Sequence, residues 1–93
     1  MAVTETHGDR QAIRERVVGH VRDYLREQRG VEVGDIDDST RFKEDLDLDS
    51  LDLAALAVDW EDDYGVTVED ERVVTCSTVG KAVDLVQSLQ ETA

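Results

Sequence analysis

The sequence has little of several residue types, and each shortage excludes a class of protein. A single cysteine, Cys76, allows no intramolecular disulfide, which excludes a secreted disulfide-linked scaffold. No apolar run approaches the length needed to cross a bilayer, and residues 1–9 lack the apolar stretch of a signal peptide. Aromatic residues make up only 4% of the chain, so the core has to be mainly Val, Leu, Ile and Ala. These features predict a soluble cytoplasmic protein that is not bound to a membrane.

Basic residues are missing from one long stretch of the chain. Between Glu44 and Glu71 there are twelve carboxylates and no Lys or Arg, and the formal net charge of the whole chain is −13. A phosphate backbone would be repelled by this field, so nucleic-acid binding is disfavoured. The same field would steer the protein toward partners with basic docking surfaces.

Ninety-three residues are enough for one small domain. Residues 1–9 are polar and aperiodic and are predicted to form a flexible tail, which leaves 10–91 as the domain. A first helix is expected at about residues 10–28, with Asp9 as its N-cap and Gly30 as its stop. Apolar residues recur there at every fourth position and form one stripe, with Val18 and Tyr24 beside it: Ile13, Val17, Val21 and Leu25.

A long connection follows at residues 31–49. A loop of this length in a compact domain needs a reason, and apolar anchors can tie it across a helical bundle. The candidate anchors are Val31, Val33, Ile36, Phe42 and Leu46. We therefore expect an ordered loop and not a linker.

A second helix is expected at about residues 50–64, with Asp49 as its N-cap and Gly65 as its stop. One of its faces is apolar and would face the core: Leu53, Leu56, Ala57, Trp60 and Tyr64. Trp60 is expected in the core, where it could also line an acyl cavity.

Residues 69–74 are predicted to form a short helical turn, and Ser77 or Thr78 to cap a last helix that reaches about Gln90. The inner face of that helix is Val79, Ala82, Val83, Val86 and Leu89. The sequence shows neither paired strands nor repeats. It therefore predicts an all-α fold, a small four-helix bundle of three main helices and one short helix, with a long ordered loop between the first two.

A short motif lies at the start of the second helix. Asp49-Ser50-Leu51-Asp52 resembles the Asp-Ser-Leu attachment motif of acyl carrier proteins, and the resemblance runs from about Gly30 to Leu85. Further matching positions are Phe42, Asp45, Leu46 and the run Glu61-Asp62-Asp63-Tyr64-Gly65. Three residues alone are a weak signal. Their place after a long anchored loop and before an acidic helix makes the combination specific.

The resemblance implies a covalent cofactor on Ser50, between Asp49 and Leu51. In this family a transferase moves 4′-phosphopantetheine from coenzyme A onto the serine hydroxyl, and the thiol of this arm carries acyl groups as thioesters. A serine in the first turn of a helix would place the phosphate near free backbone N–H groups and the positive end of the helix dipole. The resemblance further implies a carrier and not an enzyme, with no catalytic residue of its own.

The helix after Ser50 is the predicted docking surface for partner enzymes. These partners would be a phosphopantetheinyl transferase and synthase enzymes such as a ketosynthase or an acyltransferase. The predicted contacts are a partly exposed apolar strip and the acids beside it: Leu51, Ala54 and Val58, with Asp52, Glu61, Asp62 and Asp63. The plainer alternative is a solvated acidic face that only improves solubility.

Several positions depart from the usual pattern of the family. A Gly-Ala pair commonly precedes Asp-Ser-Leu, and here it is Asp47-Leu48. The other departures are Ala55 in place of an acid, Trp60 in place of a smaller aliphatic residue, Glu69 in place of Pro and Cys76 in place of an apolar residue. None touches the attachment chemistry. Together they favour a specialised pathway over housekeeping fatty-acid synthesis.

Metal-binding and enzymatic functions fit less well. Asp45, Asp47 and Asp49 match the first three acidic ligands of an EF-hand loop, but Ser50 replaces its Gly and Leu56 its bidentate Glu, so no metal site is predicted. The lone His7 and His20 are expected at the surface, and no catalytic motif is present.

The sequence as a whole predicts a discrete, monomeric acyl carrier of a dissociated fatty-acid or polyketide synthase, since Met1 opens the chain and little follows the last helix. One alternative is a peptidyl or aminoacyl carrier of a nonribosomal peptide pathway. A second is an acidic docking module without a prosthetic group.

Overall fold

The computed structural model describes residues 10–92, and helices make up the regular structure throughout that range. Helix α1 spans Arg10–Tyr24 and continues into the π-helical turn η2, Leu25–Arg29. Helix α2 spans Ser50–Tyr64, the short α3 spans Asp70–Val73, and α4 spans Val79–Thr92. The predicted bundle of three main helices and one short helix is therefore confirmed. The predicted tail at residues 1–9, with Asp9 as a cap, lies outside the described residues.

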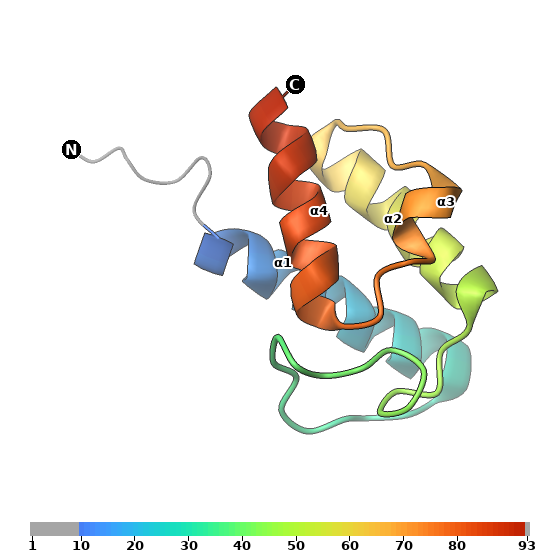
Figure 1. Ribbon diagram of the computed structural model, residues 1–93. Coiled ribbons are helices and arrows are strands. Elements are labelled where there is room, and N and C mark those ends of the chain that lie inside the picture. The colour runs from blue at the N-terminus through green and yellow to red at the C-terminus, as the bar shows by residue number, and fades with distance from the viewer. Residues whose placement is uncertain (1–9, 93) are drawn as a thin grey trace.

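Helix α1 is the centre of the arrangement, because it packs against both α4 and α2. Figure 1 shows α4 crossing α1, with α3 beside α2. The long green loop passes below the start of α4. The buried side of α1, continued by the first residue of η2, is the stripe expected from the four-residue spacing: Ile13, Val17, Val21 and Leu25. None of the helices among the described residues is long and apolar enough to cross a membrane.

The end of the first helix differs from the expectation. The chain leaves α-helical geometry at Leu25 and makes one wider π-turn before it stops at Gly30. Gly30 has a φ of 64°, and its N–H donates to the carbonyl groups of Arg26 and Leu25. This left-handed conformation suits glycine because it has no Cβ, so the predicted stop is confirmed.

The long loop is ordered and is joined to the start of α4. Phe42 donates its N–H to Ser77 O at 3.1 Å, and Val79 donates to Thr40 O at 2.9 Å. The anchors Ile36, Phe42 and Leu46 are buried and Val33 is half-buried, but Val31 is 43% exposed, so the prediction that Val31 anchors the loop is wrong. Leu48, which had not been expected among the anchors, is only 1% exposed. Both differences depend on where the loop turns toward the core, and the spacing of apolar residues in the sequence does not reveal this.

Helices α2 and α4 begin and end close to their predicted positions. Gly65 ends α2 with a φ of 66° and donates to Glu61 O at 2.8 Å. Thr78 caps α4, since its hydroxyl accepts the N–H of Lys81 at 3.2 Å. Trp60 is buried in the same core as the stripe of the first helix, as predicted, and Cys76 is buried there too.

Candidate functional site

Ser50 is the first residue of α2 and is exposed to solvent. The preceding residue, Asp49, is extended and accepts the N–H of Asp52 on Oδ1 at 3.0 Å. Asp52 Oδ2 in turn accepts the N–H of Asp49 at 2.9 Å, which completes a capping box around Ser50. The predicted N-cap at Asp49 is therefore confirmed. The hydroxyl of Ser50 leaves the helix at its positive end, where the first N–H groups of any α-helix lack a helical acceptor.

This local geometry fits a phosphodiester on Ser50. The group would lie beside the free N–H groups and the dipole of α2, which favour an anion. Among the acids near Ser50, the negative charge of Asp52 is offset by the guanidinium of Arg29. The arm would extend into solvent from an exposed position and would supply the thiol that carries an acyl group.

Asp52 is the residue whose placement differs most from the prediction. Its residue surface is only 7% exposed, so the prediction that it lies on the exposed acidic flank of α2 is wrong. Its Oδ1 accepts the hydroxyl of Tyr24 at 2.5 Å, and its Oδ2 accepts Arg29 Nη2 at 2.6 Å. Burial by itself would raise the pKa of Asp52, but the hydrogen bonds from Tyr24 and Asp49 and the charge of Arg29 hold that pKa below its usual range. The carboxylate is therefore an internal link between α1 and α2.

Asp47 is the one residue other than glycine with a positive φ among the described residues, at 58°. Its side chain is fully exposed, while its backbone carbonyl accepts Arg29 Nη1 at 3.2 Å. The next residue, Leu48, then turns into the core and donates its N–H to Phe42 O at 2.8 Å. A left-handed conformation at this position gives a physical reason for a glycine there, the residue that Asp47 replaces in the family pattern.

The apolar strip on α2 is exposed where a partner could reach it. Leu51 is 78% exposed and Val58 54%, whereas Ala54 is half-buried. Ala55, Asp59 and Asp62 are also exposed and follow the same helical spacing. Ala55 and Asp59 had not been predicted as contacts. They follow Leu51 by four and eight residues, however, and this spacing places them on the same side of the helix.

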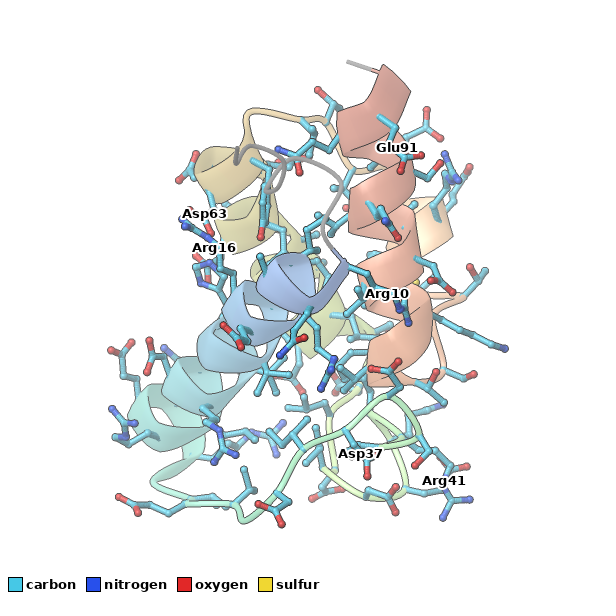
Figure 2. The ribbon with its side chains drawn as sticks, turned by 90° about the vertical axis from the view of Figure 1, so that its left-hand side faces the viewer. Arg10, Arg16, Asp37, Arg41, Asp63 and Glu91 are labelled. Carbon is cyan, nitrogen blue, oxygen red and sulfur yellow. The ribbon has the colours of Figure 1, made fainter. Side chains whose placement is uncertain are left out.

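Two of the predicted docking acids bind other parts of the chain. Glu61 is half-buried and accepts the N–H of Val68 at 2.7 Å. Asp63 forms an ion pair with Arg16 of α1 and contacts His20 Nε2 at 3.1 Å, as Figure 2 shows for Arg16 and Asp63. The hydrogen bond from Arg16 is the main reason why the pKa of Asp63 falls to about 2. His20 is therefore half-buried with a partner, and not a lone surface residue as expected.

Cys76 is the single thiol of the chain. Its Sγ is 3.6 Å from the carbonyl of Arg72, and burial raises its pKa, so little thiolate is present near neutral pH.

Comparisons with known proteins agree with this site. The family described as the phosphopantetheine attachment site matches residues 20–86. A meromycolate extension acyl carrier protein of Mycolicibacterium smegmatis is 35% identical over 80 residues, which cover 86% of this chain and 81% of the relative. The protein of the same name from Mycobacterium leprae is 36% identical over 77 residues, covering 83% of this chain and 67% of the relative.

A solved structure shares the fold. The crystal structure of an acyl carrier protein from Thermotoga maritima superposes with a TM-score of 0.71 at 26% identity, over 86% of this chain and 93% of the other. The fold, the matched family region and the relatives agree with one another, and the chain belongs to the acyl carrier protein family, whose members carry acyl groups on a phosphopantetheine arm attached to a serine.

Proposed function

We propose that Ser50 carries the 4′-phosphopantetheine arm and that residues 10–91 form the carrier domain. The observation that supports this most strongly is an exposed serine at the first position of a helix whose N-terminus is closed by a capping box. Asp49 and Leu51 flank it and set the direction in which the arm leaves. The terminal thiol of the arm then holds the acyl intermediate as a thioester.

The chain acts in this scheme as a carrier and as the substrate of other enzymes. The two acids on either side of Ser50 in the helix start, Asp49 and Asp52, are both engaged in the capping box. Both hold backbone N–H groups there, and we propose that the base that activates the hydroxyl comes from the transferase. The carrier contributes a positioned hydroxyl and a surface that partners recognise.

The exposed face of α2 is the proposed docking surface for a phosphopantetheinyl transferase and for synthase enzymes such as a ketosynthase or an acyltransferase. Its proposed members are Leu51, Ala54, Ala55, Val58, Asp59 and Asp62. Asp52, Glu61 and Asp63, which were also predicted to dock, bind other parts of the chain. We propose that these three hold the helix in place and add to the negative field, while the exposed face makes the direct contacts.

The class of cargo is proposed from the relatives. Two of them are named meromycolate extension acyl carrier proteins, which favours a growing fatty-acyl chain over a peptidyl or aminoacyl group. We propose that the chain works as a discrete cytoplasmic monomer in a dissociated synthase of fatty-acid type. A polyketide synthase uses the same arm chemistry and is the second candidate.

Intact mass measurement tests the attachment site. The apo chain is incubated with coenzyme A, magnesium and a promiscuous phosphopantetheinyl transferase. A gain of a single arm is expected for the natural chain and for Ser39→Ala, in which an exposed serine of the loop is removed, and no gain is expected for Ser50→Ala. An arm on Ser50→Ala, or a folded natural chain that gains nothing, would refute the assignment.

Thiol titration gives a second readout. Because Cys76 is buried and its pKa is raised, the folded apo chain should react slowly with a thiol reagent at mildly alkaline pH. Attachment of the arm should add a single fast-reacting thiol. A Cys76→Ala variant, in which the arm supplies the whole signal, is the control.

A further inference from the structure

We infer that Arg29 is a positioning residue for the chemistry at Ser50, because its guanidinium binds the backbone before that serine and the side chain of Asp52 after it. The inference rests on the proposed attachment at Ser50. It assigns a function to the π-helical end of the first helix, which the attachment motif leaves unexplained.

The guanidinium of Arg29 contacts the segment that contains Ser50 at two points. Nη1 donates to the backbone carbonyl of Asp47 at 3.2 Å, three residues before Ser50. Nη2 donates to Asp52 Oδ2 at 2.6 Å, two residues after it. The rigid planar fork of an arginine fixes two acceptors relative to each other, which a single-point cation cannot do. The two bonds therefore bracket Ser50.

The first bond acts on a strained turn. A left-handed conformation is unfavourable for a residue with a Cβ, and Asp47 adopts it with a φ of 58°. The conformation sends the next residue, Leu48, into the core and brings Asp49 to the capping position. Loss of the Arg29 bond to the Asp47 carbonyl would leave this turn held only by the backbone bonds from Asp47 N–H to Lys43 O and from Leu48 N–H to Phe42 O, and would favour its relaxation to a negative φ. That relaxation would move the start of α2 and the hydroxyl of Ser50 with it.

The second bond acts through the capping box. Asp52 receives Arg29 on one oxygen and the hydroxyl of Tyr24 on the other, while it also accepts the N–H of Asp49. Tyr24 and Arg29 both lie at the end of the first helix, where η2 replaces the α-helical turn. A change of direction at this π-turn would thus be transmitted through one carboxylate to the N-terminus of α2.

Transfer of the arm requires the Ser50 hydroxyl to meet the phosphate at close range in a defined direction. Misplacement of a reacting group by about 1 Å can cost two orders of magnitude in rate. The exposed contacts on α2, such as Leu51 and Val58, are independent of Arg29. Loss of Arg29 should therefore lower kcat for arm transfer more than it raises KM for the carrier.

The test is a rescue experiment on the full chain, with the initial rate of arm transfer by one transferase as readout. Arg29→Ala is expected to lower kcat on the order of tenfold with a small change in KM. Arg29→Ala combined with Asp47→Gly should recover part of that loss, since glycine adopts the left-handed turn without help while the link to Asp52 stays broken. Arg29→Ala combined with Asp47→Ala, which also removes the carboxylate but keeps a Cβ, should not recover.

Arg29→Lys keeps the positive charge but offers one point of contact, so its kcat should lie between those of Arg29→Ala and the natural chain. All rates are measured well below each variant's unfolding temperature, which separates positioning from global stability. Unchanged kcat in Arg29→Ala and Arg29→Lys, or equal behaviour of the two double variants, would overturn the inference. A natural chain that receives no arm would instead refute the proposed attachment at Ser50.

Discussion

Gly80 of α4 donates its backbone N–H to the carbonyl oxygen of Asp38 at 2.9 Å, and a Cβ on Gly80 would lie 3.0 Å from both that oxygen and the Cβ of Asp38. The long loop can approach α4 this closely only because position 80 has no side chain. The side chain of Arg10 lies across the same junction, with Nη2 2.9 Å from Asp38 Oδ2.

Gly80→Ala should therefore destabilise the fold by about 1–3 kcal/mol, since the added methyl group would force the loop backbone away from α4. The free energy of unfolding from urea titration measures this effect. Gly19→Ala is the control, because a Cβ at Gly19 meets no atom within 4 Å and the residue lies inside α1. It should stabilise the chain by about 0.5–1 kcal/mol through helix propensity. Equal effects of the two substitutions would contradict the close packing at Gly80.

The two tyrosines provide a matched pair of substitutions. The hydroxyl of Tyr24 donates to Asp52 at 2.5 Å, whereas the buried hydroxyl of Tyr64 has no hydrogen-bond partner among the described residues. Tyr24→Phe should cost about 1–3 kcal/mol, because it removes a hydrogen bond to a charged group. Tyr64→Phe should be neutral or slightly stabilising, because no bond is lost and a buried polar group is removed. It also keeps the ring, whose centroid is 5.5 Å from the guanidinium carbon of Arg16. Urea unfolding of both variants checks the order, and a larger loss for Tyr64→Phe would contradict it.

The sequence predicts most of the fold because its signals are local. The four-residue apolar period located α1, and an aspartate and a glycine placed at the two ends of α2 gave the bounds that the structure shows. The exposure of Val31 and the burial of Leu48 were not predicted, because they depend on the path of a loop with no periodicity.

The site could be predicted only in part, because its internal links join residues far apart in the chain. The motif identified Ser50 as the candidate residue, but the buried state of Asp52 depends on Arg29 and Tyr24, which are more than twenty positions away. Two signals were nevertheless present in the sequence. Arg29 continues the four-residue period after Leu25, and Asp52 stands three residues after the N-cap, where a capping box places its second acid.

Asp63 should make stability depend on pH in the acid range. Its pKa of about 2 in the folded chain lies below its ordinary value of 3.8, so its contribution to stability is complete above about pH 4 and is lost as the pH falls toward 2. The shift corresponds to about 2 kcal/mol at most, and solvent screening of the exposed Arg16 should reduce this to about 1 kcal/mol.

Asp63→Asn should therefore be less stable than the natural chain at about pH 6, and the difference should shrink to a small fraction of that value by about pH 2. Asp62→Asn removes the same charge from an exposed neighbouring position and serves as the control. Urea titrations across this range measure the differences. A gap between Asp63→Asn and the natural chain that is as large at about pH 2 as at about pH 6 would rule out the ion pair as its cause.

Charge reversal on α2 should separate docking from folding. Asp62 is exposed, so Asp62→Lys should leave the free energy of unfolding within about 0.5 kcal/mol of that of the natural chain. At low salt it should raise KM for a partner enzyme with a basic surface several-fold, through slower association, and high salt should shrink the difference because screening weakens the attraction. Glu27→Lys, an equal reversal at an exposed residue of η2, is the control and should leave KM nearly unchanged.

Asp63→Lys should lower stability as well, because it places a cation against Arg16 and His20. An equal rise in KM for Glu27→Lys and Asp62→Lys would show that partners respond to the total charge of the carrier and not to the exposed face of α2.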